Sequence, residues 1–344
     1  MSQSSAGGRF SIGVGETWAL ITALSYTATN ILLRAAAVHI DPWLGSMLRQ
    51  VPVFALAWGA VALMRSPEVL PASSRFLGWR FVAALVMAGS VSFVIGNLFF
   101  FNALADGGLG ITASGAQAGT ILMALLLGLV LLRERPRLNT WAGAAVLAGG
   151  LALIGLARGG SGEAWLAGIF FAVGAGSSYA VANVLTRYVQ RSRPTTFVAL
   201  AGTSLGGLVP LLLIETVRGG GNPLAGADAG QVAIVLAAGC FNALALLGIT
   251  QSLRHLTVGI SSSIQSATVV FSFIGAVVIF GERGDPLTIT GILAVAAGII
   301  LANLRRRTPT PTPPLAVGDY PSDSGASEAA ASPGSASGVV NRTK

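Results

Sequence analysis

The sequence predicts an all-α polytopic membrane protein of ten transmembrane helices, arranged as two inverted five-helix repeats. Three observations support this fold class. Charged residues make up only 10% of the chain, against about 25% in soluble globular domains, so there is too little charge to cover a water-facing surface. Apolar stretches long enough to cross a bilayer follow one another along most of the chain. Finally, two segments of the first half recur in the second half.

Each apolar stretch is about 18 to 25 residues long, which suits a hydrocarbon core about 30 Å thick at a helical rise of about 1.5 Å per residue. We expect spans at 16–34, 42–64, 80–103, 108–132, 138–157, 163–187, 195–217, 231–253, 257–280 and 286–304. Residues 1–15 form a short N-terminal segment in which no cleavable signal peptide is evident. Residues 305–344 are rich in Pro, Ser and Ala and predict a disordered tail.

The arginines predict the orientation of the chain. If the N-terminus is cytoplasmic, sixteen of the 21 Lys and Arg residues fall in cytoplasmic segments. Arg34, Arg158, Arg218 and Arg283 then face outside, and Arg49 lies within a span. This excess predicts a multi-pass protein of the cell membrane with both termini in the cytoplasm. Because the basic residues are scattered between spans rather than gathered on one face, the positive net charge does not indicate nucleic-acid binding.

The repeat is visible as two matched segments. SYTATNILLR at 25–34 returns as SYAVANVLTR at 178–187, and residues 131–150 align without gaps on residues 279–298. The first repeat therefore occupies 16–157 and the second 158–304. Because five is an odd number of spans, the second repeat enters the bilayer from the opposite side. Two similar halves of opposite orientation favour alternating access, although inverted repeats also occur in channels and a purely stabilising role stays open.

The ends of the fourth and ninth predicted spans carry a family resemblance. LLRERP at 131–136 and FGERGDP at 280–286 each precede a Gly-rich helix. Within a ten-helix, two-repeat layout, these motifs resemble the EamA-type permeases of the drug/metabolite transporter superfamily, over residues 16–304. The resemblance implies export or exchange of small metabolites, amino acids among them, without a bound cofactor.

The residue inventory excludes several kinds of chemistry. The only lysine is Lys344, so the chain has no phosphate-binding lysine motif and no Schiff-base nucleophile. The two histidines, His39 and His255, lack cysteine or acidic partners at metal-ligand spacing. The acidic residues fall at span ends or outside spans, which disfavours a proton-driven exporter of cations. We therefore expect no catalytic residues, no metal and no cofactor.

Polar residues at mid-span are the candidates for substrate binding. Gln117 and Gln265 are repeat equivalents that lie about 13 and 12 Å deep by the helical rise. Transporter sites gather near the midplane at the repeat interface. The candidate cavity is therefore lined by this pair together with Ser114, Ser262, Ser266 and Asn242. Interhelical hydrogen bonds are an equally good explanation of the two glutamines.

Arg49 is the one charge inside a predicted span, about 10 Å along the second helix. A central arginine costs roughly 2.5–3.5 kcal/mol on insertion scales. It could bind a carboxylate or phosphate of the substrate with two parallel hydrogen bonds. Alternatively, its side chain extends outward to the headgroups.

Two further sets of residues have candidate roles. Tyr26 and Asn30 share one helix face, and their equivalents Tyr179 and Asn183 share another, so all four are candidate gating residues or simple packing residues. A glycine stripe runs along the fifth and tenth spans, which suits close helix contact within the chain or in a homodimer. It comprises Gly143, Gly150, Gly291 and Gly298.

Together these features predict a secondary transporter of a small polar metabolite such as an amino acid. Its partners would be that small molecule and the lipid bilayer. The competing predictions are a membrane-embedded enzyme and a non-transporting scaffold or receptor. An enzyme requires a nucleophile and a base clustered within the spans, and the sequence shows no such cluster.

Overall fold

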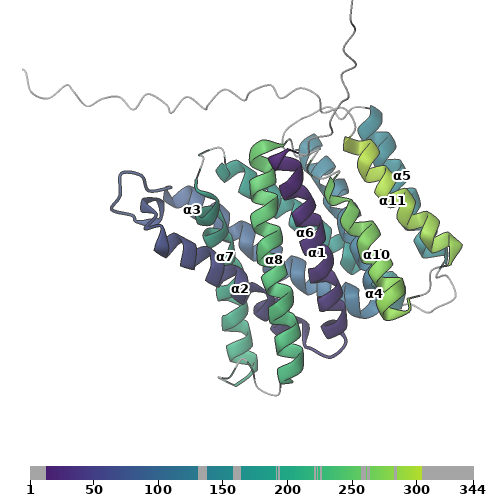
Figure 1. Cartoon of the computed structure of the whole chain (residues 1–344), viewed down its shortest axis with the longest axis horizontal. Coiled ribbons are helices and arrows are strands. Elements are labelled where there is room, and N and C mark those ends of the chain that lie inside the picture. The colour runs from purple at the N-terminus through teal and green to yellow at the C-terminus, as the bar shows by residue number, and fades with distance from the viewer. Residues whose placement is uncertain are drawn as a thin grey trace, which may run out of the picture. The chain divides into compact units, whose positions relative to one another are not determined.

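The computed structural model describes residues 13–130, 138–157, 164–190, 192, 194–220, 222, 224, 227–256, 261, 264–282 and 285–303. Several residues named above lie outside the described residues, among them Arg158, Ser262, Arg283 and the tail from 305 onward. All regular structure in the described chain is helical (Figure 1).

The first repeat contains helices that match the first five predicted spans within a few residues. They are α1 (Val14–Ala37), α2 (Pro42–Leu63), α3 (Trp79–Gly89), a π-helical segment η2 (Ser90–Gly96), α4 (Asn97–Val130) and α5 (Leu138–Ala157), with a short 3₁₀ turn η1 (Pro67–Val69) after α2. The third and fourth predicted spans are not separated by a loop. They form one continuous helical path that is broken only at Gly108.

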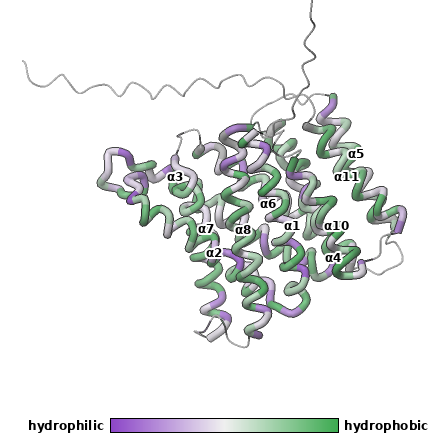
Figure 2. Tube along the Cα trace, in the orientation of Figure 1, coloured by the Kyte–Doolittle hydropathy of each residue, from purple (hydrophilic) through white to green (hydrophobic). Residues whose placement is uncertain are grey.

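The second repeat contains α6 (Ala164–Gln190), α7 (Thr196–Arg218), α8 (Ala229–His255), α10 (Ala267–Phe280) and α11 (Pro286–Asn303). Five helical segments of the described chain are long and apolar enough to cross a membrane, and three shorter apolar helices accompany them. One of the five, Trp79–Leu127, covers the third predicted span and most of the fourth. Figure 2 shows hydrophobic residues along the helices, with hydrophilic residues common in the connection between α2 and α3.

Aspartates begin three of these helices. Asp41 accepts hydrogen bonds from the backbone N–H groups of Trp43 and Leu44 at the start of α2. Asp228 and Asp285 do the same at the starts of α8 and α11. An aspartate at this position accepts from N–H groups that have no partner within the helix. Three of the acids that the sequence places at span ends therefore serve as helix caps.

The two repeats pack against each other along their length. α1 contacts α8 and α10, α2 contacts α7 and α8, α4 contacts α6, and α5 contacts α11. Exchanging the repeats maps α2–α7 and α5–α11 onto themselves and α2–α8 onto the contact between α3 and α7. The α1–α10 contact corresponds to that between α6 and the second part of α4. This symmetry fits the inverted repeat that the sequence predicts.

The glycine stripe lies between α5 and α11, which run side by side in Figure 1. A Cβ atom on Gly150 would lie 2.7 Å from the carbonyl oxygen of Gly291, and one on Gly298 would lie 2.7 Å from the backbone nitrogen of Leu147. Small residues thus let the two helices approach closely, as is common between membrane helices. The stripe serves a contact within the chain, and a homodimer remains a prediction.

Candidate functional site

Arg49 lies at the centre of a buried polar cluster. Its side chain projects from the middle of α2, and only 5% of the residue surface is exposed. Nη2 donates a hydrogen bond to Oδ1 of Asn242 on α8 at 2.8 Å, and Nη1 donates to Oδ1 of Asn97 at the start of α4 at 3.1 Å. The guanidinium also stacks over the ring of Phe100, with 5.6 Å between Cζ and the ring centroid. The side chain is therefore held in the interior and does not extend to the headgroups.

The cluster draws on both repeats. Arg49 and Asn97 belong to the first repeat, and Asn242 belongs to the second. Tyr179 on α6, also in the second repeat, donates its hydroxyl hydrogen to the same Oδ1 of Asn97 at 3.1 Å. Movement of one repeat against the other must therefore change these contacts. We call Arg49, Asn97, Tyr179 and Asn242 the Arg49 cluster.

The positive charge of this cluster has no negative partner among the described residues. The ion pairs found there join Arg34 to Glu282 and Arg218 to Asp41 and Glu215. Among the described residues, the groups around Arg49 are neutral: two amide oxygens, the face of an aromatic ring and the hydroxyl of Tyr179. Burial of an unpaired charge is costly, so such a residue is retained in a membrane helix mainly where it has a function.

Several buried polar atoms at the cluster have no hydrogen-bond partner among the described residues. They are Nε of Arg49 and the side-chain nitrogens of Asn97 and Asn242, and all three carry hydrogens that can be donated. Next to Arg49 on α2, Gln50 is fully buried, and neither of its amide atoms is hydrogen-bonded to any described residue. Buried polar atoms without partners are rare in proteins, and several at one place indicate a site that is completed by a ligand or water.

Irregular helix geometry surrounds the cluster. Pro52, one turn after Arg49, has no N–H to donate to the carbonyl group of Leu48. α8 approaches α2 so closely that a Cβ atom on Gly239 would lie 2.7 Å from the carbonyl oxygen of Arg49. The π-helical segment η2 ends directly before Asn97. Such π-helical turns are frequent at functional sites, because they redirect side chains within a helix.

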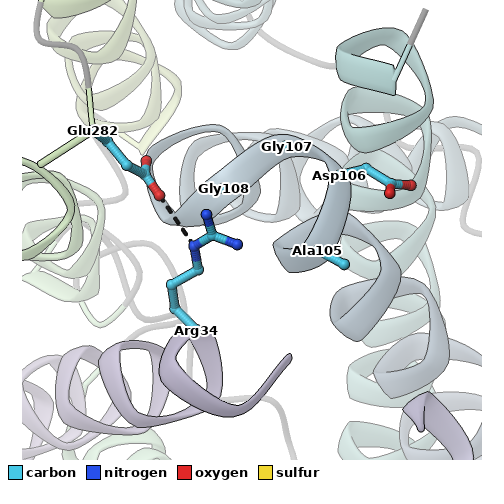
Figure 3. Close-up of a pocket in the computed structure, with 6 residues that line it drawn as sticks. All are labelled: Arg34, Ala105, Asp106, Gly107, Gly108 and Glu282. Carbon is cyan, nitrogen blue, oxygen red and sulfur yellow. Dashed lines mark ion pairs between the residues drawn. The ribbon is translucent and has the colours of Figure 1, made fainter. Parts of the chain in front are cut away.

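A second polar group joins the repeats at the C-terminal end of α1. Arg34 forms an ion pair with Glu282, with 3.2 Å between Nε and Oε1, and donates from Nη1 to the carbonyl oxygen of Leu104 at 2.6 Å. Figure 3 shows the two side chains pointing toward each other, whereas Asp106 points away. All three residues line a cavity of about 120 Å³. Asn30, one turn earlier on α1, donates to Oγ of Ser272 on α10 at 3.3 Å.

Glu282 also caps the second part of α4. Gly108 has φ 77° and ψ 178°, a conformation open almost only to glycine, and it frees the N–H groups that follow. Oε1 of Glu282 accepts from the backbone nitrogen of Leu109 at 2.7 Å, and Oε2 accepts from that of Gly110 at 3.2 Å. A carboxylate at a helix N-terminus is stabilised by the helix dipole. One glutamate thus ties together α1, α4 and the end of α10.

The other residues that the sequence singles out are distributed as follows. Gln265 is buried and donates to Oγ of Ser261, which in turn lies 2.8 Å from Oγ of Ser252. Gln117 is half-buried on α4, and Ser114 donates to the carbonyl oxygen of Gly110 in its own helix. In the described part of the chain, no hydrogen bond links the two glutamines to each other or to the Arg49 cluster.

The remaining candidates differ in burial. Ser266 is buried, Tyr26 is half-buried and Asn183 is exposed. Arg49 and Asn242, which the sequence nominates separately, are in direct contact. Asn97 was not among the predicted site residues, although it is a polar residue deep in the third predicted span, and that depth is the signal that could have identified it.

Comparison with known proteins identifies a transporter family and a similar fold. The sequence profile of the EamA-like transporter family matches residues 13–156 and again residues 166–304. A crystal structure described only as that of a protein resembles this fold with a TM-score of 0.59, at 19% identity, over 85% of this chain and 97% of its own. At that identity the likeness concerns the fold alone. No curated protein matches the chain.

Proposed function

Because the chain belongs to the EamA-like transporter family, we propose that it is a secondary transporter of the cell membrane. It exports or exchanges a small polar metabolite, such as an amino acid, by alternating access of its two inverted repeats. The distribution of arginines supports cytoplasmic termini, which puts the Arg34–Glu282 contact on the outer side.

The Arg49 cluster is the observation that carries this proposal. It is buried, polar and built from both repeats, which are the properties of a transport site at a repeat interface. When the repeats rock, the hydrogen bonds that cross between them break on one side and form on the other. A substrate bound there is exposed first to one compartment and then to the other.

The contacts between α1 and α10 supply the matching gate. Asn30 and Arg34 lie one turn apart on α1, and both reach residues of the second repeat, Ser272 and Glu282. In the proposed cycle these contacts hold the outer side closed and must separate before the substrate leaves. Tyr26 lies on the same face of α1, one further turn inward.

Transport in reconstituted vesicles tests the proposal. Uptake of metabolites is measured for the parent protein, for Arg49→Gln and for Ser74→Ala, an exposed control in the α2–α3 connection. We expect flux with the parent and the control and a loss of flux of more than tenfold with Arg49→Gln.

A Gln117→Leu/Gln265→Leu double variant tests in the same assay whether the paired glutamines belong to the transport path. Absence of any flux across a broad metabolite panel would favour a scaffold instead.

A further inference from the structure

We propose that the Arg49 cluster binds a single carboxylate group of the transported molecule. This inference rests on the proposed transport function and adds to it the charge of the substrate. It concerns the guanidinium of Arg49 and the amide nitrogens of Asn97 and Asn242.

The unbalanced charge is the first reason. The guanidinium is buried, and in the described part of the chain every group that contacts it is neutral. The desolvation cost of a buried cation is offset best by an anion at hydrogen-bonding distance. Since the described chain does not supply that anion, a substrate carboxylate can. A cationic or neutral substrate leaves the charge unbalanced.

The direction of the amide groups is the second reason. Arginine can only donate hydrogen bonds, so the side-chain oxygens of Asn97 and Asn242 must face it. Their NH₂ groups point elsewhere and have no partner among the described residues, and neither has Nε of Arg49. All three free groups are donors. A carboxylate carries only acceptors, with about four lone pairs on its two oxygens, and it therefore complements this set.

The number of charges distinguishes a carboxylate from a phosphate monoester. A phosphate monoester carries about −1.5 to −2 near neutral pH, and a carboxylate carries −1. Arg49 is a single cation, and the other buried partners of the cluster are neutral. Arg34 and Arg218 are already paired with acids elsewhere. One guanidinium therefore neutralises a carboxylate but leaves a phosphate dianion in excess.

Thermal unfolding of the purified full chain in detergent tests the inference with matched probes. Two acids are compared with their primary amides, alanine with alaninamide and lactate with lactamide. Glycerate is compared with glycerol 3-phosphate, in which a phosphorylated CH₂OH group replaces the carboxylate. We expect at least one carboxylate to raise Tm by about 5 °C at a hundredfold excess over its Kd. Its amide partner should leave Tm unchanged.

Two variants separate a binding role from a structural one. Asn242→Asp places an internal carboxylate beside Arg49, so it should keep the protein folded while abolishing the response to external carboxylates. Asn222→Asp changes the net charge equally at an exposed loop and keeps the acceptor for the backbone nitrogen of Leu224, so it should respond like the parent. Arg49→Lys keeps the charge and should retain a weakened response.

The inference is overturned if no carboxylate raises Tm, if amides or phosphate esters raise it more than the acids do, or if Asn242→Asp responds like the parent. Vesicle flux distinguishes this failure from failure of the proposed function. Transport of a neutral or cationic compound would leave the transporter standing without the carboxylate site. Carboxylate binding without flux of the same compound would support the carboxylate site and contradict the proposed transport function.

Discussion

Gln50 is a single buried residue whose effect on stability and on transport can be tested. Its side chain is fully buried, and neither amide atom has a hydrogen-bond partner in the described part of the chain. A buried polar group without a partner costs about 1–3 kcal/mol. We expect Gln50→Met, which is similar in volume, to raise the free energy of unfolding by about 1 kcal/mol and to lower transport. A thermal melt and a flux assay of the same preparation check both effects. A variant that is less stable than the parent would show that Gln50 makes contacts that stabilise the fold.

Asp41 offers a pH-dependent prediction at the water-exposed end of α2. The guanidinium of Arg218 donates to both carboxylate oxygens at 2.9 and 3.2 Å, and the backbone nitrogens of Leu44 and Trp43 add to the effect. These bonds hold the pKa of the Asp41 carboxyl below its usual value. A carboxyl whose pKa is depressed by folding stabilises the protein above its unfolded pKa, and the contribution is lost as the pH falls through the lower, folded value.

Asp41→Asn removes that charge but keeps an oxygen that can cap α2. We expect the variant to be less stable than the parent at pH 7, and the gap in Tm to close as the pH falls below about 4. Melting curves of both proteins over this range measure the gap. Because Asp41 is partly exposed, high salt should narrow the gap at pH 7. A gap that is independent of pH would assign the effect to the cap rather than to the charge.

At the scale of the element, the break in α4 depends on Gly108. Its positive φ disfavours any side chain, and a Cβ atom there would lie 2.6 Å from Oε1 of Glu282. We expect Gly108→Ala to destabilise the protein by about 1–3 kcal/mol. Gly149 on α5 is the matched control, because it is helical and the space that a Cβ atom would occupy there is open. Gly149→Ala should be neutral or stabilising by up to about 1 kcal/mol. Comparable melting temperatures for the two variants would contradict this explanation of the break.

The contact between α1 and α10 predicts a change in accessibility. Glu282→Gln removes the ion pair with Arg34 and should populate states in which the two helices separate. Accessibility is reported by a cysteine introduced as Ser272→Cys, because Ser272 is fully buried in this structure. The exposed Cys240 is replaced by serine in every variant. We expect a membrane-impermeant maleimide to label it severalfold faster in Glu282→Gln. Ser204→Cys, equally buried on α7, should not change. Equal acceleration at both cysteines would indicate general loosening.

At the scale of the whole molecule, hydropathy and the repeat were enough to predict the helices and the pairing of the two halves. Hydropathy does not register backbone dihedral angles, so neither the continuous path from α3 into α4 nor the π-helical segment was predictable. Depth along a helix likewise selects Gln117 and Gln265 but does not say which way a side chain points. The contact between Arg49 and Asn242 depends on the close approach of α2 and α8 at Gly239, which sequence spacing alone does not reveal.

The opposite orientation of the two repeats has a direct test. Arg137 and Asp285 are equivalent positions of the two repeats, at the starts of the fifth and last spans. An odd number of spans per repeat puts them on opposite sides of the membrane, with Asp285 outside according to the arginine distribution. Both cysteine variants are made in a protein whose Cys240 is replaced by serine and are expressed in intact cells. An impermeant maleimide should label Asp285→Cys in these cells, whereas Arg137→Cys should react only after the membrane is permeabilised. Labelling of both positions from the same side would show that the two repeats have the same orientation in the membrane. Alternating access between equivalent halves would then lose its structural basis, because two halves of the same orientation cannot present equivalent gates to opposite compartments.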